Sequence, residues 1–214
     1  MPEASLPHGF QYSSARHEAE TAFCGMWLYL ATEILFFGPL FLAWIYCRHW
    51  ELVGFDEGAR QTNLVLGTLN TALLVTSSLA YSLGLAFIER GDRRRLAQCC
   101  MVAWLLGAAF LTIKFGVEWR EEFARGLFPG VKFSIEGAAR SGAQLFYVFY
   151  FVSTAIHGLH MVVGLFLVGW IIARAETFTS ERHVPVTVVG LYWSFVDMIW
   201  VFLFPLIYLI GRGA

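Results

Sequence analysis

Apolar residues run almost without interruption through five long stretches of the chain, and short polar segments separate these stretches. They cover residues 23–47, 63–88, 96–117, 145–173 and 186–210. A helix needs about 20 apolar residues to cross a hydrocarbon layer roughly 30 Å thick. Strands of a membrane barrel alternate over about ten residues instead, whereas these runs are continuous. The pattern predicts an all-α, polytopic membrane bundle with five transmembrane helices, with residues 1–22 as a polar N-terminal segment and 23–214 as the membrane domain.

Composition agrees with a membrane protein and excludes some partners. The sequence is 57% hydrophobic and 14% charged, and its 15 Lys and Arg residues nearly balance 16 Asp and Glu residues. A chain without a basic excess lacks the charge that a phosphate backbone attracts, so nucleic acid is not expected as a partner. The four cysteines show no Cys-x-x-Cys spacing and are expected to be small buried residues. The polar N-terminus lacks the apolar region of a secretory signal.

Arginines are concentrated in the short segment 89–95 between the second and third stretches. They are Arg90, Arg93, Arg94 and Arg95. Short loops that are rich in Lys and Arg stay on the cytoplasmic side of the membrane. We therefore expect this segment and the N-terminus to be cytoplasmic, and the longer 118–144 segment and the C-terminus to be external.

Glu33 lies about ten residues into the first apolar stretch, beside Ile34, Phe36 and Phe37. An ionised carboxylate is costly at that depth unless it is paired or hydrated. No Lys or Arg occurs in the same stretch, so a protonated acid is expected. Two roles are open for Glu33, which either joins two helices by a hydrogen bond or lies on a path for protons or oxygen.

His157 and His160 lie three residues apart and so share one face of the fourth stretch, about 60° apart. A haem with two axial histidines needs them on opposite sides of its ring, which one such pair does not supply. The other histidines lie outside the stretches or near their ends, so we expect no metal or haem site in this chain. A polar network is favoured instead, in which one histidine pairs with Asp197 of the fifth stretch.

Lys114 and Glu118, four residues apart near the outer end of the third stretch, form a potential ion pair whose long side chains can reach the membrane interface. Anchoring is favoured over transport for this pair. A stand-alone transporter is an alternative class, with Glu33, Asp197 and Lys114 as a relay. The odd number of spans and the absence of an internal repeat argue against it.

Two further patterns concern the packing and shape of the helices. Asn70, Ser77 and Gly84 recur at a spacing of seven and predict a close-packing seam on the second stretch. Pro205 leaves the carbonyl of Val201 without its amide partner, so the outer half of the last stretch is expected to bend.

Five ordered motifs resemble the cytochrome c oxidase subunit III family, which is subunit III of the haem–copper oxidases. They are MWLYLATEILFFG at 26–38, LNTALL followed by TSS at 69–78, ERGDRR at 89–94, HGLHM at 157–161 and YWSFVD at 192–197. The resemblance covers nearly all of the chain from Cys24 onward. Ser194 stands where the family usually has histidine. The chain resembles the five-helix bacterial members, since it begins at what corresponds to the third helix of the seven-helix members.

The resemblance implies an accessory subunit of a terminal oxidase in the bacterial inner membrane, which couples O2 reduction in aerobic electron transport to proton pumping. Haem and copper are then expected in subunits I and II, with no cofactor in this chain. Glu33 matches the acid that reacts with carbodiimides in the family, and the subunit is expected to stabilise the catalytic subunit, to bind phospholipid and to support proton uptake. His157, His160 and Arg174 are candidates for binding a lipid headgroup.

The expected partners are oxidase subunit I, subunit II, phospholipids and a small subunit IV. Helices from subunit I or subunit IV are expected to pack beside this chain with lipid between them. The segments around Glu33 and His157 favour a cytochrome c oxidase. A quinol oxidase and a homologue associated with nitric oxide reductase are the alternatives.

Overall fold

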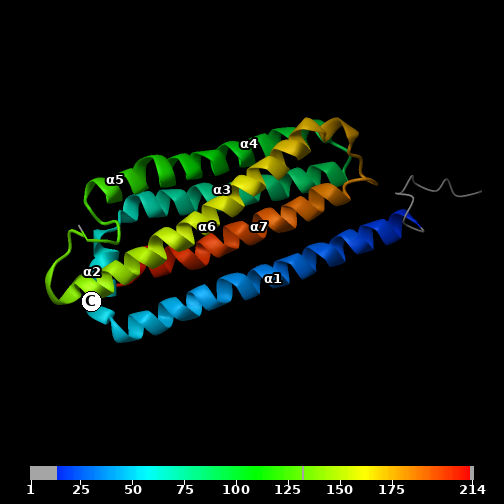
Figure 1. The fold of residues 1–214 in the computed structure, drawn as a ribbon. Coiled ribbons are helices and arrows are strands. Elements are labelled where there is room, and N and C mark those ends of the chain that lie inside the picture. The colour runs from blue at the N-terminus through cyan, green and yellow to red at the C-terminus, as the bar shows by residue number, and fades with distance from the viewer. Residues whose placement is uncertain (1–13, 132, 213–214) are drawn as a thin grey trace, which may run out of the picture.

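The structure is a computed structural model that describes residues 14–131 and 133–212, and in that part of the chain the regular elements are helices (Figure 1). The α-helices are α1 (Ala15–Trp50), α2 (Leu52–Gln61), α3 (Leu64–Glu89), α4 (Arg93–Leu111), α5 (Trp119–Ala124), α6 (Arg140–Ala173) and α7 (Val184–Phe204). Two π-helical segments, η1 (Thr112–Glu118) and η4 (Pro205–Leu209), extend α4 and α7, and η2 (Gly137–Ala139) and η3 (Ala175–Thr177) are short 3-10 turns. Five helices within these described residues are long and apolar enough to cross a membrane, which confirms the predicted all-α membrane bundle.

Successive spanning helices run in opposite directions, so the connections collect at two ends of the bundle (Figure 1). We call one end the arginine end, because it holds residues 90–92 together with the start of α1 and the α6–α7 connection. The other end, with α2, α5 and the last described residues, is the α2 end. The N-terminal end of α1 and the arginine segment therefore lie on the same side, as the sequence predicted. Helix α1 begins at Ala15, before the predicted start of the first stretch.

The turn at the arginine end follows from two residues between α3 and α4. Gly91 has a φ of 82°, in the left-handed region that a residue without Cβ adopts at no steric cost. Its amide donates to the Ile88 carbonyl at 2.8 Å, which closes the last turn of α3. The Asp92 side chain then accepts from the Arg95 amide at 3.0 Å and starts α4 as an N-cap.

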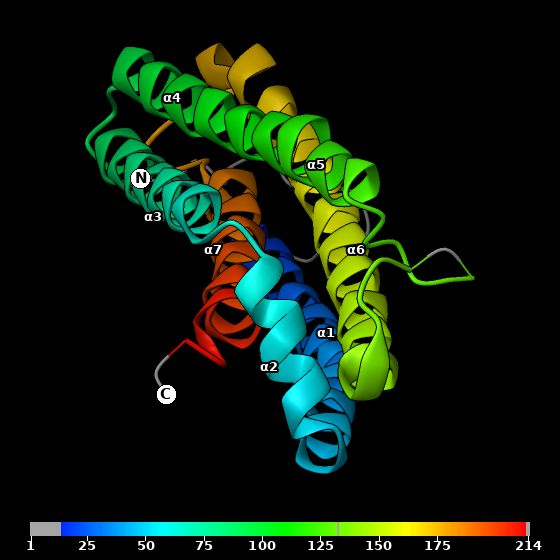
Figure 2. The ribbon, with the colours of Figure 1, turned by 90° about the vertical axis from the view of Figure 1, so that its left-hand side faces the viewer.

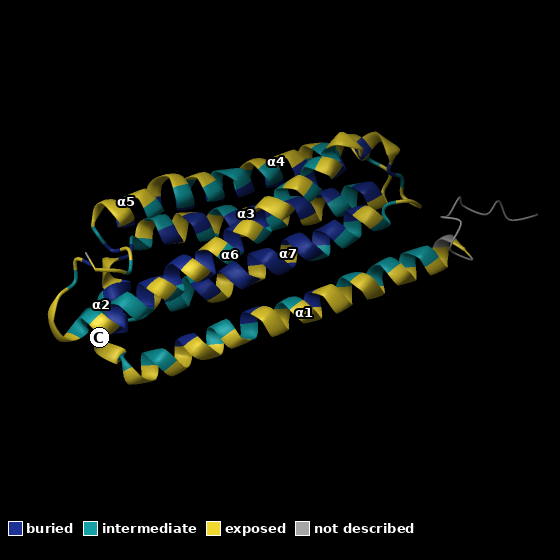
Figure 3. Cartoon of the chain, in the orientation of Figure 1, coloured by how far each residue is buried: buried dark blue, intermediate teal, exposed yellow. Residues whose placement is uncertain are grey.

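Helix α7 lies at the centre of the bundle and α1 lies at its edge (Figures 2 and 3). In the most apolar window of each helix, 61% of the α7 residues are buried, against 17% for α1. Trp193 of α7 is fully buried because two neighbouring helices carry glycine opposite its ring. A Cβ on Gly107 of α4 would lie 2.8 Å from that ring, and one on Gly164 of α6 would lie 2.9 Å away. Helices α3, α4, α6 and α7 therefore form the packed core.

The predicted seam on α3 is confirmed as a close contact with α4 and α7. The Ser77 hydroxyl donates to the Ala103 carbonyl at 3.0 Å and accepts from the Trp193 indole at 3.1 Å. A Cβ on Gly84 would lie 3.1 Å from the Cβ of Cys99. Small and hydroxyl side chains thus let these helices approach closely and hydrogen-bond across their interface.

Two expectations about exposure and loops need correction. Residues 48–62 were expected to be a connection, but α2 occupies most of this range and packs against α6, where a Cβ on Gly54 would lie 2.4 Å from the Gly142 Cα. Among the cysteines, Cys100 alone is buried, and Cys24 is exposed on the surface of α1. In a membrane protein a small apolar side chain can face the surface without an energetic penalty, which is why burial was predicted wrongly for the others.

The expected irregularity after Pro205 takes the form of η4. Proline has no amide to bond the Val201 carbonyl, so the helix continues with wider π-helical turns. Helix α4 widens in the same way through η1, without a proline. Both π-helical segments lie in the half of the bundle towards the α2 end.

Candidate functional site

Glu33 and His160 form a polar contact between α1 and α6, near the middle of both helices. The His160 Nε2 atom lies 3.0 Å from Glu33 Oε2, and each side chain keeps 14% of its surface exposed. The two residues are 127 positions apart in the chain. Glu33 therefore has a partner from another helix, which its own stretch of sequence did not offer.

The hydrogen bond of His160 Nδ1 indicates how many protons the Glu33–His160 pair holds. Nδ1 lies 2.9 Å from the Ile156 carbonyl, which can only accept, so Nδ1 carries a hydrogen. A hydrogen bond between Nε2 and Glu33 then needs one more proton, held either by the carboxyl group or by the imidazole. In both forms the pair is neutral as a whole, which suits its depth in the bundle.

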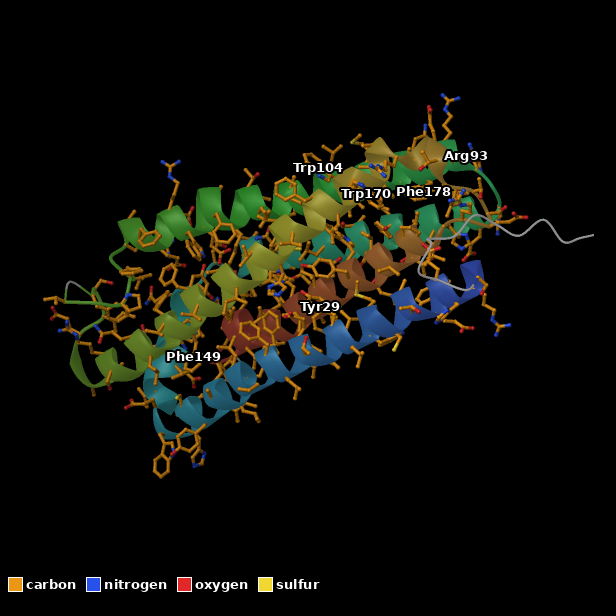
Figure 4. All side chains as sticks on the ribbon, turned by 45° about the vertical axis from the view of Figure 1, so that its right-hand side comes forward. Tyr29, Arg93, Trp104, Phe149, Trp170 and Phe178 are labelled. Carbon is orange, nitrogen blue, oxygen red and sulfur yellow. The ribbon has the colours of Figure 1, made fainter. Side chains whose placement is uncertain are left out.

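Aromatic residues surround the pair and fix its position. The Tyr192 hydroxyl of α7 donates to the His160 carbonyl at 2.9 Å, and its ring centroid lies 6.1 Å from that of Tyr29 on α1. Figure 4 shows Tyr29 on the side of α1 that faces the other helices. The Phe37 ring lies 5.4 Å from the His160 ring, and Phe37 is buried. The pair thus lies at the junction of α1, α6 and α7.

His157 lies in the core of the bundle and not beside Glu33. Its ring lies between Phe110 of α4, at 5.5 Å, and Trp200 of α7, at 5.2 Å. Neither ring nitrogen has a hydrogen-bond partner among the described residues, and the side chain is buried. The expectation that His157 contacts a lipid headgroup is wrong, because the packed core excludes it from the surface.

Asp197 is buried on α7, but it does not pair with either histidine. Within residues 14–131 and 133–212 neither carboxylate oxygen has a hydrogen-bond partner, and the neighbouring polar side chain is that of Ser78 on α3. The expected contact between Asp197 and His157 or His160 is therefore not found. The contact is absent because of the rotation of the helices about their axes: Asp197 lies on the face of α7 towards α3, whereas His160 lies on the face of α6 towards α1.

Arg174 caps the C-terminal end of α6 at the arginine end of the bundle. It is exposed, and its guanidinium lies 5.3 Å from the centre of the Trp170 ring. At about 1.5 Å per residue, α6 separates Arg174 from His160 by roughly 21 Å. One headgroup therefore cannot contact both, and Arg174 remains the candidate at the surface.

Lys114 and Glu118 form the predicted ion pair, with Nζ 3.0 Å from Oε1, but not at the membrane interface. Both side chains are 1% exposed. Lys114 Nζ also donates to the hydroxyls of Tyr208, at 2.6 Å, and Tyr150, at 3.1 Å. Both hydroxyls donate in turn to Glu118 Oε1. The expectation of an interfacial anchor is wrong, because these tyrosines and the core replace water around the pair.

The positions of the buried polar residues determine whether they could bind a metal ion and which chemistry they can perform. In the part of the chain that the structure describes, no group of three or more His, Cys, Asp or Glu side chains is placed to hold a metal ion. The chemistry available at Glu33 and His160 is the binding and transfer of a proton. The same holds for the cluster around Lys114.

Comparison with known proteins decides the family. The sequence model of the family "Cytochrome c oxidase subunit III" matches residues 13–212. The chain belongs to this family. Membership confirms the resemblance that the five motifs indicated, and it makes the protein a multi-pass membrane protein of the haem–copper oxidase type.

Individual relatives of this subunit III chain come from both oxidase types. The cytochrome c oxidase subunit 3 of Thermostichus vulcanus is 30% identical over 191 residues, which cover 88% of this chain and 87% of the relative. The quinol oxidase subunit 3 of Bacillus subtilis is 27% identical, and the match covers 97% of both chains. A haem–copper oxidase subunit I+III of Aeropyrum pernix is 26% identical and is matched over 22% of its length. The preference for the cytochrome c branch stays a prediction.

Two functional features were missed by reasoning from the sequence. The partner of Glu33 could not be read from spacing, because His160 lies on a different helix. The burial of Lys114 has a signal in the sequence, since Tyr150 and Tyr208 are polar residues within otherwise apolar stretches. Such tyrosines can accept hydrogen bonds from a cation in a span and cover it with their rings, while Glu118 supplies the opposite charge.

Proposed function

We propose that this chain is the accessory subunit III of a haem–copper terminal oxidase, with the haem and copper centres held in partner subunits. The family match over residues 13–212 is the observation that carries this proposal. The subunit stabilises the catalytic subunit during O2 reduction and proton pumping. Purification of the complex through a tag on this chain tests the assignment. We expect subunits I and II and haem absorbance to co-purify, and purification of the chain alone from intact membranes contradicts it.

Association with subunit I is supported by the Aeropyrum pernix relative, whose name joins subunits I and III in a single protein. The exposed position of α1 at the edge of the bundle supports further helices packed beside it, from subunit I or a small subunit IV (Figure 3). Cross-linking from Leu35, which points outward from α1 with 75% of its surface exposed, tests this contact. We expect a cross-link to a partner subunit, and the buried Leu74 of α3 is the control position.

Within the complex, the Glu33–His160 pair is proposed to supply protons to the catalytic subunit or to line a path along which protons or oxygen reach it. Its single shared proton and residual exposure support this role. Carbodiimides react with protonated carboxyl groups, so a hydrophobic carbodiimide should label Glu33 and should fail to label Glu33→Gln. Asp197 is the internal comparison, because it lies in the core without the exposure of Glu33. Labelling that survives in Glu33→Gln counts against this role.

Phospholipid binding is proposed at the arginine end, with Arg174 as the group that contacts the headgroup phosphate. The neighbouring Trp170 supports this assignment, because tryptophan and arginine are favoured at membrane interfaces. Arg174→Ala should lower the number of phospholipids that co-purify with the complex, measured by mass spectrometry. Arg125→Ala at the α2 end serves as the control. An unchanged lipid content in Arg174→Ala contradicts the assignment.

The orientation is proposed from the arginine segment, with the N-terminus cytoplasmic and the C-terminus periplasmic in the bacterial inner membrane. Asp92→Cys tests it, in a background where Cys24, Cys47, Cys99 and Cys100 are changed to serine. An impermeant thiol reagent should label this cysteine in inverted vesicles but not in intact cells. Labelling from the periplasmic side overturns the orientation.

A further inference from the structure

A second set of buried charges lies near the α2 end of the bundle, away from Glu33 and His160. Glu122 on α5 is 1% exposed, and its Oε2 accepts from the Tyr147 hydroxyl at 3.1 Å. One helical turn further into the bundle lies Glu118, and one more turn leads to Lys114. All three side chains face the core formed with α6 and η4. We call these three residues the outer charge cluster.

The charges of the outer charge cluster do not balance. Two carboxylates oppose one ammonium group, so with all three ionised the cluster carries one net negative charge. An uncompensated charge is costly in a buried site. Arg125 follows α5, but its guanidinium lies 3.8 Å from Glu121 and donates to the Gln61 carbonyl at 3.1 Å. The cluster becomes neutral when it binds one proton.

The hydrogen bonds indicate which carboxyl group takes that proton. Glu118 Oε1 accepts from Lys114 and from the hydroxyls of Tyr150 and Tyr208. Three donors on one oxygen stabilise the ionised form. The Glu122 carboxyl group accepts a hydrogen bond from a neutral phenol, that of Tyr147, and has no ammonium group beside it. Glu122 is therefore the carboxyl group that holds the proton.

Other titratable groups around the cluster do not supply the missing positive charge. They are Tyr147, Tyr150 and His157 on α6 and Tyr208 on η4. The tyrosines are neutral donors. His157 has no hydrogen-bond acceptor within the described residues, and the charge on Lys114 opposes a second positive charge on its ring. Trp200 of α7, whose ring centre lies 5.3 Å from Lys114 Nζ, carries no charge.

Two independent features distinguish the outer charge cluster: a buried carboxylate oxygen without a hydrogen-bond partner, and a π-helical backbone. Glu118 Oε2 is buried and has no partner among the described atoms, so a second proton acceptor is available one turn from Glu122. The π-helical segments η1 and η4 carry Lys114, Glu118 and Tyr208. Such segments occur frequently at functional sites, because the wider turn changes where side chains and carbonyls point.

We propose that the outer charge cluster is a buried proton-binding site, which holds a single proton on Glu122 and exchanges it with the aqueous phase at the α2 end. Glu118 stays ionised beside Lys114, and its free oxygen is the inner acceptor. The site is separate from the Glu33–His160 pair, and its charge balance does not depend on the electron donor of the complex. Binding forms one O–H bond on the Glu122 carboxylate and requires no other reactant.

Infrared spectra of the purified membrane complex test the proposal directly. At neutral pH, the wild type should show one carboxylic-acid C=O band that is lost in Glu122→Gln and moves to lower frequency in D2O. Glu121→Gln is the matched control, because Glu121 lies on the same short helix and is exposed beside Arg125. Its spectrum should keep the band. A Glu122→Gln spectrum that keeps every acid band of the wild type overturns the proposal.

The charge balance of the outer charge cluster gives a second test, whose expected spectral changes would not occur if Glu122 had a purely structural role. Glu118→Gln leaves Lys114 opposite Glu122, so Glu122 should become ionised and its acid band should vanish although Glu122 is unchanged. Lys114→Met should add a second acid equivalent, and the double variant Lys114→Met/Glu118→Gln should return to one. The double variant also serves if either single variant fails to assemble.

A monovalent cation is the competing ligand for the uncompensated charge. In that case the wild type and Glu122→Gln should show the same acid bands, and carboxylate bands should change when Na⁺ replaces K⁺. That result overturns the proposal. A band that persists unchanged in both salts supports it.

Discussion

The outer charge cluster and the Glu33–His160 pair both place a carboxylate deep in the membrane domain, but their surroundings differ. Glu118 accepts three hydrogen bonds on one oxygen, from residues of η1, α6 and η4, and it is fully buried. The Glu33 carboxyl group contacts His160 and remains partly exposed. The outer charge cluster lies within the packed core, whereas the Glu33–His160 pair joins α1 to that core.

This difference separates two mechanical roles within one chain. In the core of α3, α4, α6 and α7, the Lys114–Glu118 pair is supported by tyrosines from α6 and η4, so removing one group leaves others without partners. At α1, one polar contact and a line of aromatic contacts attach a helix whose other face is open. Substitutions in the core should therefore cost more than equivalent ones on α1.

The largest effect is expected for Lys114→Met. The substitution leaves the buried Glu118 carboxylate without its cation, and removing one member of a buried pair costs roughly 3–5 kcal/mol. We expect a lower free energy of unfolding of the subunit and weaker retention in the complex. Unfolding in mixed micelles, followed by tryptophan fluorescence, measures the first quantity.

The control for Lys114→Met is Lys114→Met/Glu118→Gln, which removes both charges and should recover most of the stability. A single variant as stable as the wild type would mean that the core does not depend on this pair. A double variant that loses the sum of both single losses would show that the two residues act independently.

The same substitution of glycine by alanine should have opposite effects in the two regions. At Gly107 the new methyl group meets the buried Trp193 ring at 2.8 Å, and overpacking of this kind costs about 1–3 kcal/mol. At Gly38 on α1 nothing lies within 4 Å, so alanine should stabilise the helix by up to about 1 kcal/mol. Thermal unfolding of both variants checks the sign, and equal effects would contradict the comparison.

A smaller loss is expected for Glu33→Ala. It removes one hydrogen bond to His160, and such a bond contributes about 1 kcal/mol to stability. Hydrogen exchange of α1 should become faster, while exchange of α7 stays as it was. Glu33→Gln keeps both a donor and an acceptor opposite His160 Nε2, so we expect it to assemble normally. Faster exchange throughout the bundle would show that α1 and the core unfold together.

The smallest effect is expected for Arg95→Ala at the arginine end. Arg95 pairs with Asp92 at 3.1 Å, but the two side chains are 61% and 38% exposed. Exposed pairs of this kind contribute about 0–1 kcal/mol. The unfolding midpoint should hardly change. A loss as large as that of Lys114→Met would contradict the view that burial, and not the presence of a charge pair, sets the cost.

Several features of this protein could be predicted from its sequence because they depend on residues close together in the chain. Long apolar runs predict spanning helices, since a helix crosses a layer of known thickness with a known rise per residue. The four-residue spacing of Lys114 and Glu118 predicts their contact in the same way. The motifs at 26–38 and 157–161 indicated the family.

Only the tertiary structure decided which helix faces meet. In a soluble protein an apolar stripe marks the inward face of a helix, but a membrane helix is apolar on every side, so its sequence does not show its rotation. For this reason the sequence left Glu33 without a partner and assigned Asp197 to a histidine. It also placed Lys114 at the interface. The packing of α4, α6 and α7 around Trp193 and Trp200 sets those rotations, and with them the position of each buried charge.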